Sequence, residues 1–270
     1  MLKLRMLHTS IIVLILTVSA PCFSAMGIEA ITNPSADITL SFVQPGRIAK
    51  ILPKEGYSVK ANQPIVQQDD AVAQARLEQT KALSENTTQI QGSQASLDQK
   101  KIDYDKIKWA ADRGAATYLE VAHAKLEVTI AEMSLKIAIF EHEQNTRKYK
   151  EEKISVENMT LKSPVSGLIE KIEVEEGESV NGLEDVVRVV RIDPLWIDVH
   201  VPLGNAKNLK VLQGIDVIFP GGKTTTKGKV IFVSAVADAA SSTLRTRIEV
   251  PNKNNRSAGE HVRVVFSNMQ

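Results

Sequence analysis

Residues 46–59 read GRIAKILPKEGYSV, and residues 167–180 read GLIEKIEVEEGESV. The second stretch repeats the first without a gap, 121 residues further along the chain, and eight of the 14 positions are identical. The shared residues include two glycines in each copy, Gly46 and Gly56 in the first and Gly167 and Gly177 in the second. A repeat of this kind predicts two similar halves of one small β module, separated by a long insert.

The sequence around each copy supports this interpretation. Residues 38–69 alternate apolar and polar positions and are punctuated by proline and glycine, and residues 158–193 have the same pattern. Each stretch is a set of short strands that is too small to enclose a core alone. We therefore predict that the two halves pair into a single β sandwich.

The insert, residues 70–157, has the character of long helices. No proline occurs from 65 to 163, and apolar residues recur every seven positions. The row runs through Leu83, Ile90, Leu97, Tyr104 and Ala111, then through Leu119, Leu126, Met133, Phe140 and Ile154, with Ile130 and Ile137 in a second row. Sustained spacing of seven predicts a coiled-coil seam.

Residues 84–96 are nearly all polar, so the predicted seam is thin. Either the coiled coil is self-sufficient and solvated, or neighbours in an assembly complete it. We favour the second interpretation, because marginal coiled coils are often completed by partners.

The two rows are interrupted at residues 113–117, which read RGAAT. Gly114 suits the end of the first helix, since glycine adopts a left-handed conformation at little cost. Thr117 suits the start of the second helix, with Glu120 three residues later completing a capping box. We predict an antiparallel helical hairpin with its tip near Gly114 and arms about 60 Å long.

Residues 194–270 form a third module. Leu195, Ile197, Val199 and Val201 alternate with polar or aromatic positions, which predicts a half-buried strand. Further strands at similar spacing predict a small antiparallel β-barrel. The expected fold class is therefore an elongated, multi-domain α+β chain, in which a split β sandwich carries a helical hairpin and is followed by a barrel.

Residues 1–25 have a basic start, a short apolar run and small residues at the end, which is the pattern of a secretory signal peptide. An uncleaved anchor is the alternative. The one cysteine of the sequence, Cys22, excludes an intrachain disulfide and is either removed with this segment or acylated as a lipid anchor. Without Lys3 and Arg5, 31 basic and 32 acidic residues remain, so nothing suggests nucleic-acid binding.

The sequence contains no pattern that indicates catalysis. It has no glycine-rich phosphate loop, HExxH or GxSxG motif, and its histidines are scattered. His142 lies between Glu141 and Glu143, but consecutive helix residues point in different directions, so we predict a solvated helix face there and no metal site. We expect no enzyme activity and no cofactor.

The split halves resemble the lipoyl/biotinyl fold. A carrier domain of that fold holds its cofactor on a lysine at the hairpin joining the halves, and here the junction is occupied by the helical insert. The first half ends QQDDA at residues 67–71, without a lysine. A lipoyl or biotinyl carrier subunit is therefore the weaker alternative, and Lys50 and Lys171 are interpreted as solvated strand positions.

Taken together, the split halves, the inserted hairpin, the following barrel and the signal peptide resemble the periplasmic adaptor proteins, or membrane fusion proteins, of the HlyD/RND efflux family. The barrel region adds DPLW at 193–196, GKV at 228–230 and RTRIEVPN at 245–252, which are similar to segments of that family. The resemblance covers about residues 38–268.

The resemblance implies a protein of the periplasm, associated with the inner membrane. Adaptors form a ring, often of six copies, between an inner-membrane transporter and a TolC-like outer-membrane channel. The hairpin tip meets the channel, and the barrel meets the transporter. An RND transporter is favoured by the short N-terminus, and an ABC-type or type I exporter is the alternative.

Many adaptors carry a tip motif of Arg, three residues, Leu, six residues and Ser. At that spacing this chain has Lys106, Ala110 and Thr117. Together with Arg113 and Gly114 these are the expected docking residues. Lysine lacks the planar fork of arginine, so the variant motif indicates altered tip docking or a different channel partner.

Overall fold

The structure, a computed structural model, describes residues 26–221 and 225–266. The predicted signal peptide, residues 1–25 with Cys22, lies outside this range. The described residues divide into two compact units, one formed mainly by Pro34–Pro194 and the other by residues 26–33, 195–221, 225–253 and 257–266. Within the described ranges, no helix is both long enough and apolar enough to cross a membrane.

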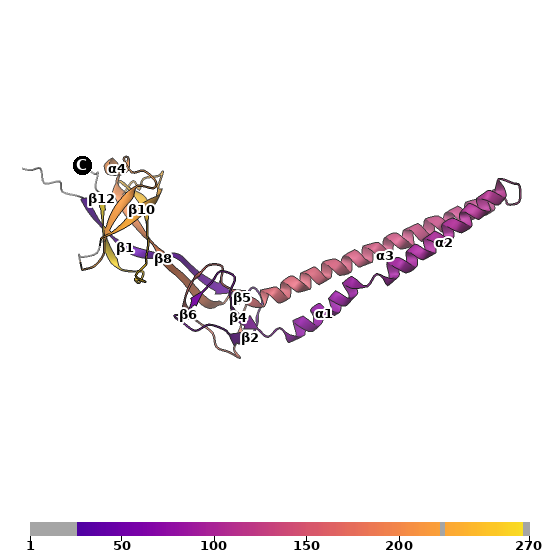
Figure 1. The fold of residues 1–270 in the computed structure, drawn as a ribbon, viewed down its shortest axis with the longest axis horizontal. Coiled ribbons are helices and arrows are strands. Elements are labelled where there is room, and N and C mark those ends of the chain that lie inside the picture. The colour runs from indigo at the N-terminus through magenta and orange to yellow at the C-terminus, as the bar shows by residue number, and fades with distance from the viewer. Residues whose placement is uncertain (1–25, 222–224, 267–270) are drawn as a thin grey trace, which may run out of the picture. The chain divides into compact units, whose positions relative to one another are not determined.

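The first unit contains the repeated β halves and three helices (Figure 1). Its elements in chain order are the second part of β1 (Met26–Ser41), β2 (Gly46–Ile51), β3 (Ser58–Val59), β4 (Pro64–Gln68), α1 (Ala71–Glu85), α2 (Thr88–Ala111), α3 (Tyr118–Asn158), β5 (Thr160–Lys162), β6 (Gly167–Ile172), β7 (Ser179–Val180) and the first part of β8 (Asp185–Pro202).

The two β halves share one hydrophobic core. Residues at the same place in each half are buried together, and they lie 121 positions apart, like the sequence repeat. These pairs are Ile48 with Ile169, Val59 with Val180, Ile65 with Val186, and Val66 with Val187. Each half therefore contributes an equivalent set of side chains to a single core, as the repeat predicted.

The halves also exchange backbone hydrogen bonds. The N–H of Ile48 donates to the carbonyl of Glu178 at 2.8 Å, and its carbonyl accepts from the N–H of Gly177 at 2.8 Å. In the other direction, the N–H of Ile169 donates to the carbonyl of Tyr57 at 3.0 Å, and its carbonyl accepts from the N–H of Gly56 at 2.8 Å. Each half thus supplies the partners of the other half's strand.

Side chains follow the same reciprocal pattern. The Glu176 carboxylate accepts from the N–H of Ile51 at 2.8 Å, and the Glu55 carboxylate accepts from the N–H of Ile172 at 2.8 Å. The strand pairs are reciprocal as well, because β2 pairs with β7 and β3 pairs with β6. The module is therefore built about an approximate two-fold relation between its halves.

The repeated glycines have identifiable roles in this module. Gly56 and Gly177 occupy the turns at φ +79° and +89°, a left-handed conformation that strains other residues. A Cβ on Gly167 would lie 2.4 Å from the carbonyl oxygen of Val190, and one on Gly46 would lie 2.8 Å from the Gln68 side chain. The first pair of glycines is needed for backbone conformation and the second pair for close packing.

Between the halves, α1 and α2 run one after the other along α3, which is a single helix of 41 residues (Figure 1). The insert is thus a hairpin of helices, and its second arm is about 60 Å long at 1.5 Å per residue. Its two ends meet at the β module, where the N–H of Gln68 donates to the carbonyl of Met159 at 2.9 Å.

The first arm is broken, which the sequence interpretation missed. Asn86, at the end of α1, has an extended conformation with ψ 111°, and α2 begins at Thr88. The Asn86 side chain accepts from the N–H of Thr88 at 3.0 Å. Asparagine and threonine compete with helical hydrogen bonding in this way, and the break falls in the polar stretch that predicted a thin seam.

The predicted seam is right in α2 and wrong in α3. Leu97 is buried and Ile90, Tyr104 and Ala111 are partly buried against α3. In α3 the fully buried residues opposite α2 are Ala124, Ala131 and Ala138, which repeat every seven positions. A second row with the same spacing, Val121, Val128 and Leu135, is partly buried. The second-arm row predicted to be the seam is exposed, as are Leu83 in the first arm and Ile130 and Ile137 in the second predicted row.

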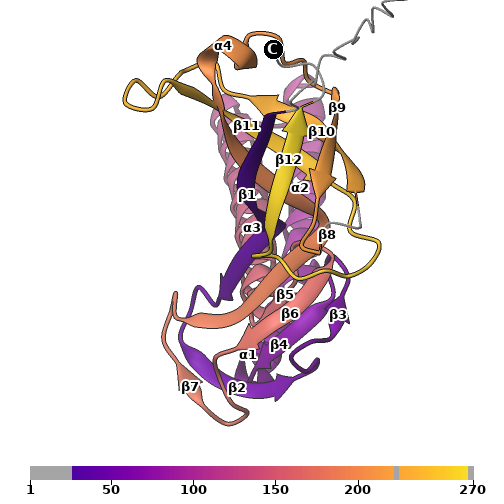
Figure 2. The same ribbon diagram turned by 90° about the vertical axis from the view of Figure 1, so that its left-hand side faces the viewer.

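The second unit is a closed barrel of six strands (Figure 2). The strand order is β1, β12, β9, β10, β11 and β8, and β1 pairs with β8 to close it. Besides parts of β1 and β8, its elements are α4 (Leu203–Ala206), β9 (Gly214–Ile218), β10 (Thr225–Val233), β11 (Thr243–Val250) and β12 (His261–Phe266).

The alternation predicted from Leu195 to Val201 is confirmed, because all four apolar residues are at most 1% exposed. One strand of the barrel was not predicted. The start of β1 pairs with β12 from Met26 opposite Phe266 to Ile31 opposite His261. The barrel thus needs residues that precede the predicted module of residues 194–270.

A common core for the two halves has a consequence for stability. We expect Ile48→Ala and Ile169→Ala each to lower the free energy of unfolding by about 2–5 kcal/mol, and to shift the same transition in denaturant titrations. Val72→Ala, at an 85% exposed position, is the control. Two separate transitions for Ile48→Ala and Ile169→Ala would show that the halves do not share a core.

The alanine seam of α3 gives a second test. Ala131→Leu inserts a larger side chain where α2 packs, so we expect it to destabilise the helical hairpin by about 1–3 kcal/mol. Leu126→Ala removes an exposed side chain and should change the stability of the monomer by less than about 0.5 kcal/mol. The reverse order of effects, measured by thermal unfolding followed through helical circular dichroism, would restore the originally predicted seam.

Candidate functional site

The hairpin tip is a tight, well-capped turn. At the end of α2, the N–H of Ala115 donates to the carbonyl of Ala110 at 2.9 Å, and the N–H of Gly114 donates to that of Ala111 at 2.9 Å. Gly114 has φ +76°. This is the Schellman arrangement, in which a left-handed glycine lets the last carbonyls find partners. The predicted role of Gly114 is confirmed.

The start of α3 is capped as predicted. The Thr117 hydroxyl accepts from the N–H of Glu120 at 3.3 Å, and the Glu120 carboxylate accepts from the N–H of Thr117 at 2.6 Å and from its hydroxyl at 2.8 Å. The two bonds that Thr117 donates hold the pKa of Glu120 below its usual range, and the bond from the N–H has the larger effect. The tip is thus fixed by local hydrogen bonds at both helix ends.

The predicted docking residues lie on and beside this turn. Lys106 and Ala110 line one shallow recess of α2 together with Ile102, Asp105 and Trp109. Arg113 lies just beyond the helix, and its guanidinium carbon is 3.8 Å from the centre of the Trp109 ring. An Arg113 N–H also donates to the Trp109 carbonyl at 3.2 Å.

Sequence reasoning missed Trp109 and Ile102. Trp109 is 61% exposed and Ile102 is 49% exposed, so each presents a large apolar surface on the exposed side of α2. The arginine stacked on Trp109 orders the ring against the tip and leaves much of its surface open. The sequence feature that could have identified Trp109 is a tryptophan that lies outside the predicted seam, two residues before Ala111.

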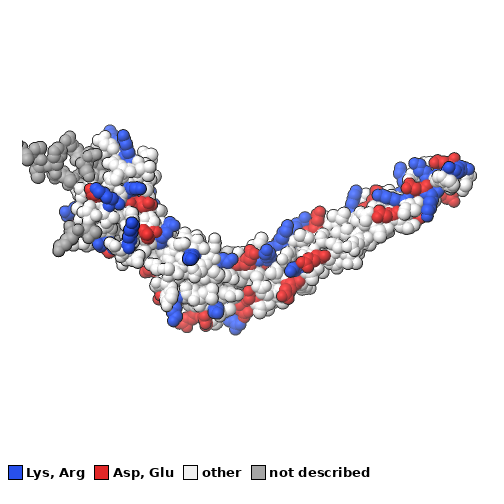
Figure 3. Space-filling model, viewed as in Figure 1, with Lys and Arg blue, Asp and Glu red and all other residues white. Residues whose placement is uncertain are grey.

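Charged side chains lie near the tip and again toward the β module, at residues 141–157. Figure 3 shows Lys, Arg, Asp and Glu crowded there on the visible face, with an uncharged stretch further along the hairpin. The uncharged stretch fits residues 86–97, which contain no charged residue. An inter-helix ion pair lies between these regions, with Lys100 Nζ 2.7 Å from a Glu127 carboxylate oxygen.

The barrel carries a second ordered cluster. Arg247 of β11 donates two hydrogen bonds of 2.8 Å to the Asp198 carboxylate of β8, and its guanidinium carbon lies 4.5 Å from the Trp196 ring centre. The Arg247 hydrogen bonds hold the pKa of Asp198 below its usual range, against the opposing effect of its partial burial. Asp198 and Arg247 are directly opposite in the strand register, so the cluster locks the two strands together.

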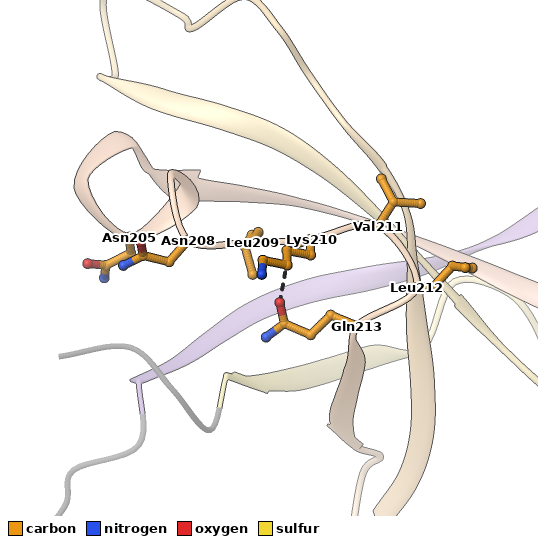
Figure 4. Close-up of a pocket in the computed structure, with 7 residues that line it drawn as sticks. All are labelled: Asn205, Asn208, Leu209, Lys210, Val211, Leu212 and Gln213. Carbon is orange, nitrogen blue, oxygen red and sulfur yellow. Dashed lines mark hydrogen bonds between the residues drawn. The ribbon is translucent and has the colours of Figure 1, made fainter.

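A recess at the barrel, between α4 and β9, is lined by Asn205, Asn208, Leu209, Lys210, Val211, Leu212 and Gln213 (Figure 4). The Gln213 side chain accepts from the N–H of Lys210 at 3.1 Å and orders the turn. Neither a carboxylate nor a histidine lines it. Across residues 26–221 and 225–266, no group of three or more His, Cys, Asp or Glu side chains is placed to hold a metal ion.

Residues 194–269 match the family model described as the CusB-like β-barrel domain. The match covers the barrel strands from the second part of β8 onward. No sequence among the curated proteins matches the chain.

Solved structures are similar to this chain over most of its length. MacA from Actinobacillus actinomycetemcomitans is similar with a TM-score of 0.72 at 16% identity, over 90% of this chain and 79% of that one. The membrane fusion protein Spr0693 from Streptococcus pneumoniae R6 is similar with a TM-score of 0.58 at 16% identity, over 91% of this chain and 100% of that one.

A MacA–MexA chimera containing the α-hairpin domain of Pseudomonas aeruginosa MexA is similar with a TM-score of 0.51 at 18% identity, over 89% of this chain and 78% of that one. The chain therefore has the fold of a membrane fusion protein.

The capping box at Thr117 predicts a measurable pKa difference. Thr117→Ala keeps the backbone N–H, which lowers the pKa of Glu120 most, and removes the hydroxyl bond, so we expect that pKa, measured by NMR titration, to rise part of the way toward its ordinary value. Because the folded-state pKa is lowered, the cap acts fully above the unfolded pKa and is lost as pH falls through the folded value. Amide exchange at residues 118–121 should accelerate in the variant at neutral pH. An unchanged Glu120 pKa would contradict the capping box.

Proposed function

We propose that this chain, with the fold of membrane fusion proteins and a CusB-like barrel, is the periplasmic adaptor subunit of a tripartite efflux pump. It links an inner-membrane transporter to a TolC-like outer-membrane channel, and its copies assemble into a ring, which we expect to have six members. The observation that carries the proposal is one β module interrupted by a helical hairpin and followed by a barrel.

The hairpin is suited to hold a binding surface at a distance from the β module. In this proposal the module is a lipoyl-like sandwich and the hairpin a coiled coil, as the resemblance implies. The surface is the tip, with Lys106, Ala110, Arg113, Gly114 and Thr117 as its docking residues. Order at the tip favours binding, because the caps on both helices fix the backbone before the channel arrives.

The proposed role is protein binding and not catalysis. The motifs of the sequence indicate no reaction, and the clusters at Trp109 and at Arg247 combine aromatic and arginine side chains, which are typical of protein interfaces. We propose that the chain acts without a cofactor. The lipoyl or biotinyl carrier alternative has no lysine at the junction of the halves, where α1 leaves after Asp70.

The transporter partner is proposed to be of the RND class. An ABC-type or type I exporter is the alternative. The signal-like stretch of residues 1–25 supports export to the periplasm, with a lipid anchor at Cys22 as an option. Identification of the transporter that co-purifies with the chain from native membranes separates the two classes.

Tip docking predicts a specific effect of charge reversal. Lys106→Glu changes an exposed side chain of the tip recess, so the hairpin should fold normally and capture of a TolC-like channel from solubilised membranes should fall at least about tenfold, or about 1.4 kcal/mol. Lys101→Glu is the matched control, since Lys101 is exposed on another face of the same helix. Equal capture by wild type and both variants would argue against docking through the tip.

A further inference from the structure

A turn at one end of the barrel displays two apolar side chains that its own geometry does not require. Val211 is 57% exposed and Leu212 is 73% exposed. Leu212 also has φ +70°, a left-handed conformation that strains a leucine. Figure 4 shows both side chains projecting from the turn. The fold of the barrel alone therefore does not explain why a leucine occupies this position.

Another turn of the chain shows which residue the geometry favours. Residues 60–63 read KANQ and residues 210–213 read KVLQ. In both turns the glutamine N–H donates to the lysine carbonyl at 3.1 Å, and the glutamine side chain accepts from the lysine N–H. The third residue has φ +65° at Asn62 and +70° at Leu212. Asparagine tolerates this conformation better than leucine does, so Leu212 serves something other than the turn.

Two further connections lie side by side at this end of the barrel. Pro202, the last residue of β8, is opposite Thr243, the first residue of β11. The loop of residues 234–242 therefore lies beside α4, and the N–H of Leu203 donates to the carbonyl of Ser242 at 3.0 Å.

The turn of residues 210–213 lies at the same end. The N–H of Leu212 donates to the Val230 carbonyl at 2.8 Å, close to the end of β10 at Val233, where the chain enters the loop of residues 234–242. The large apolar residues exposed on these connections form one barrel-end patch, which consists of Leu203, Val211, Leu212 and Val236.

The charged residues around the barrel-end patch are mostly basic. Residues 203–213 include Lys207 and Lys210, both exposed, and no acidic residue. The loop of residues 234–242 contains one acidic residue, Asp238. Aliphatic side chains with lysines beside them suit the surface of a phospholipid bilayer, where the aliphatic groups enter the acyl boundary and the lysines meet anionic headgroups.

The polypeptide enters the barrel at this same end. Met26, the first residue of β1, is opposite Phe266, the last residue of β12. β12 pairs antiparallel with β9, so its end lies near the start of β9, directly after the turn of residues 210–213. Figure 2 shows α4 and the start of β1 at one end of the barrel. Cys22, the optional site of a lipid anchor, precedes Met26 by four residues, or at most about 14 Å of extended chain.

We propose that the barrel-end patch contacts the surface of a phospholipid bilayer, with its apolar side chains at the acyl boundary and Lys207 and Lys210 among the headgroups. The inference rests on the proposed function, which places the chain at the inner membrane. A single acyl chain holds a protein on a membrane only marginally, so stable attachment needs a second contact beside the anchor. The barrel-end patch supplies that contact.

Fluorescence quenching by lipid tests the contact. The exported chain from Met26 contains no cysteine, so a fluorophore can be placed on Asn208→Cys, exposed at the barrel end, or on Thr225→Cys, exposed near the opposite end. A histidine tag before Met26 holds each protein on vesicles of phosphatidylethanolamine and phosphatidylglycerol that contain a nickel-chelating lipid and a nitroxide-labelled lipid. We expect at least about threefold stronger quenching at residue 208 than at residue 225, because the patch enters the acyl boundary.

The variant Leu212→Asn shows whether the patch is responsible. It gives this turn the residue found at Asn62, so we expect an unchanged or raised melting temperature and at least about twofold weaker quenching at residue 208. Leu183→Asn is the matched control. Leu183 is 75% exposed with φ +65° in a turn of the first unit, so the same substitution there should leave the quenching unchanged.

Three results would overturn the proposal. Equal quenching at residues 208 and 225 would show that the tag alone holds the barrel near the vesicle. Quenching that Leu212→Asn leaves unchanged would show that the patch makes no lipid contact, and if that variant lowers co-purification of the transporter, the patch binds protein instead. A melting temperature lowered by Leu212→Asn, as by a core substitution, would show that the leucine is structural.

The outcome is separable from that of the proposed function. If Leu212→Asn weakens the quenching while Lys106→Glu leaves channel capture unchanged, the membrane contact stands and tip docking fails. If Lys106→Glu lowers capture while residue 208 is quenched no more than residue 225, tip docking stands and the membrane contact is rejected.

Discussion

The exchange of backbone hydrogen bonds between the two β halves is the constraint on which the first unit depends. Ile48 takes its partners from Gly177 and Glu178, and Ile169 takes its partners from Gly56 and Tyr57. A buried backbone group left without a partner costs about 1–3 kcal/mol, so neither half is stable alone. Whatever lies between the halves must bring its ends together. The hairpin does so, and it can therefore extend from the module without disturbing its core.

The helical hairpin depends on small residues where its two arms meet. The fully buried seam residues of α3 are alanines, which let α2 approach closely, and Val121, Val128 and Leu135 are partly buried beside them. Leu126, Met133 and Phe140 of the same helix are exposed. The break at Asn86 affects the first arm only, because α3 runs unbroken past it. One continuous helix, α3, therefore supports the hairpin along its length.

Features set by local chemistry could be predicted from the sequence. Gly114, Thr117 and Glu120 act within a few residues of one another, and the repeat places both halves in one core. The seam of α3 was missed because alanine gives a weak hydrophobic signal beside leucine and phenylalanine. The barrel strand at residues 26–33 was missed because its partner, β12, begins at His261, more than 200 residues away, and pairing over that distance leaves no local pattern.

Native-state hydrogen exchange of the full chain tests the central claim most directly. The amides of Ile48, Gly56, Ile169 and Gly177 make the reciprocal bonds, two in each half. If the halves form one cooperative unit, their exchange should converge on a single opening free energy as denaturant is added. Convergence of all four is the predicted result. If the two amides of residues 46–59 opened with one free energy and those of residues 167–180 with another, the halves would be independent and the account would be contradicted.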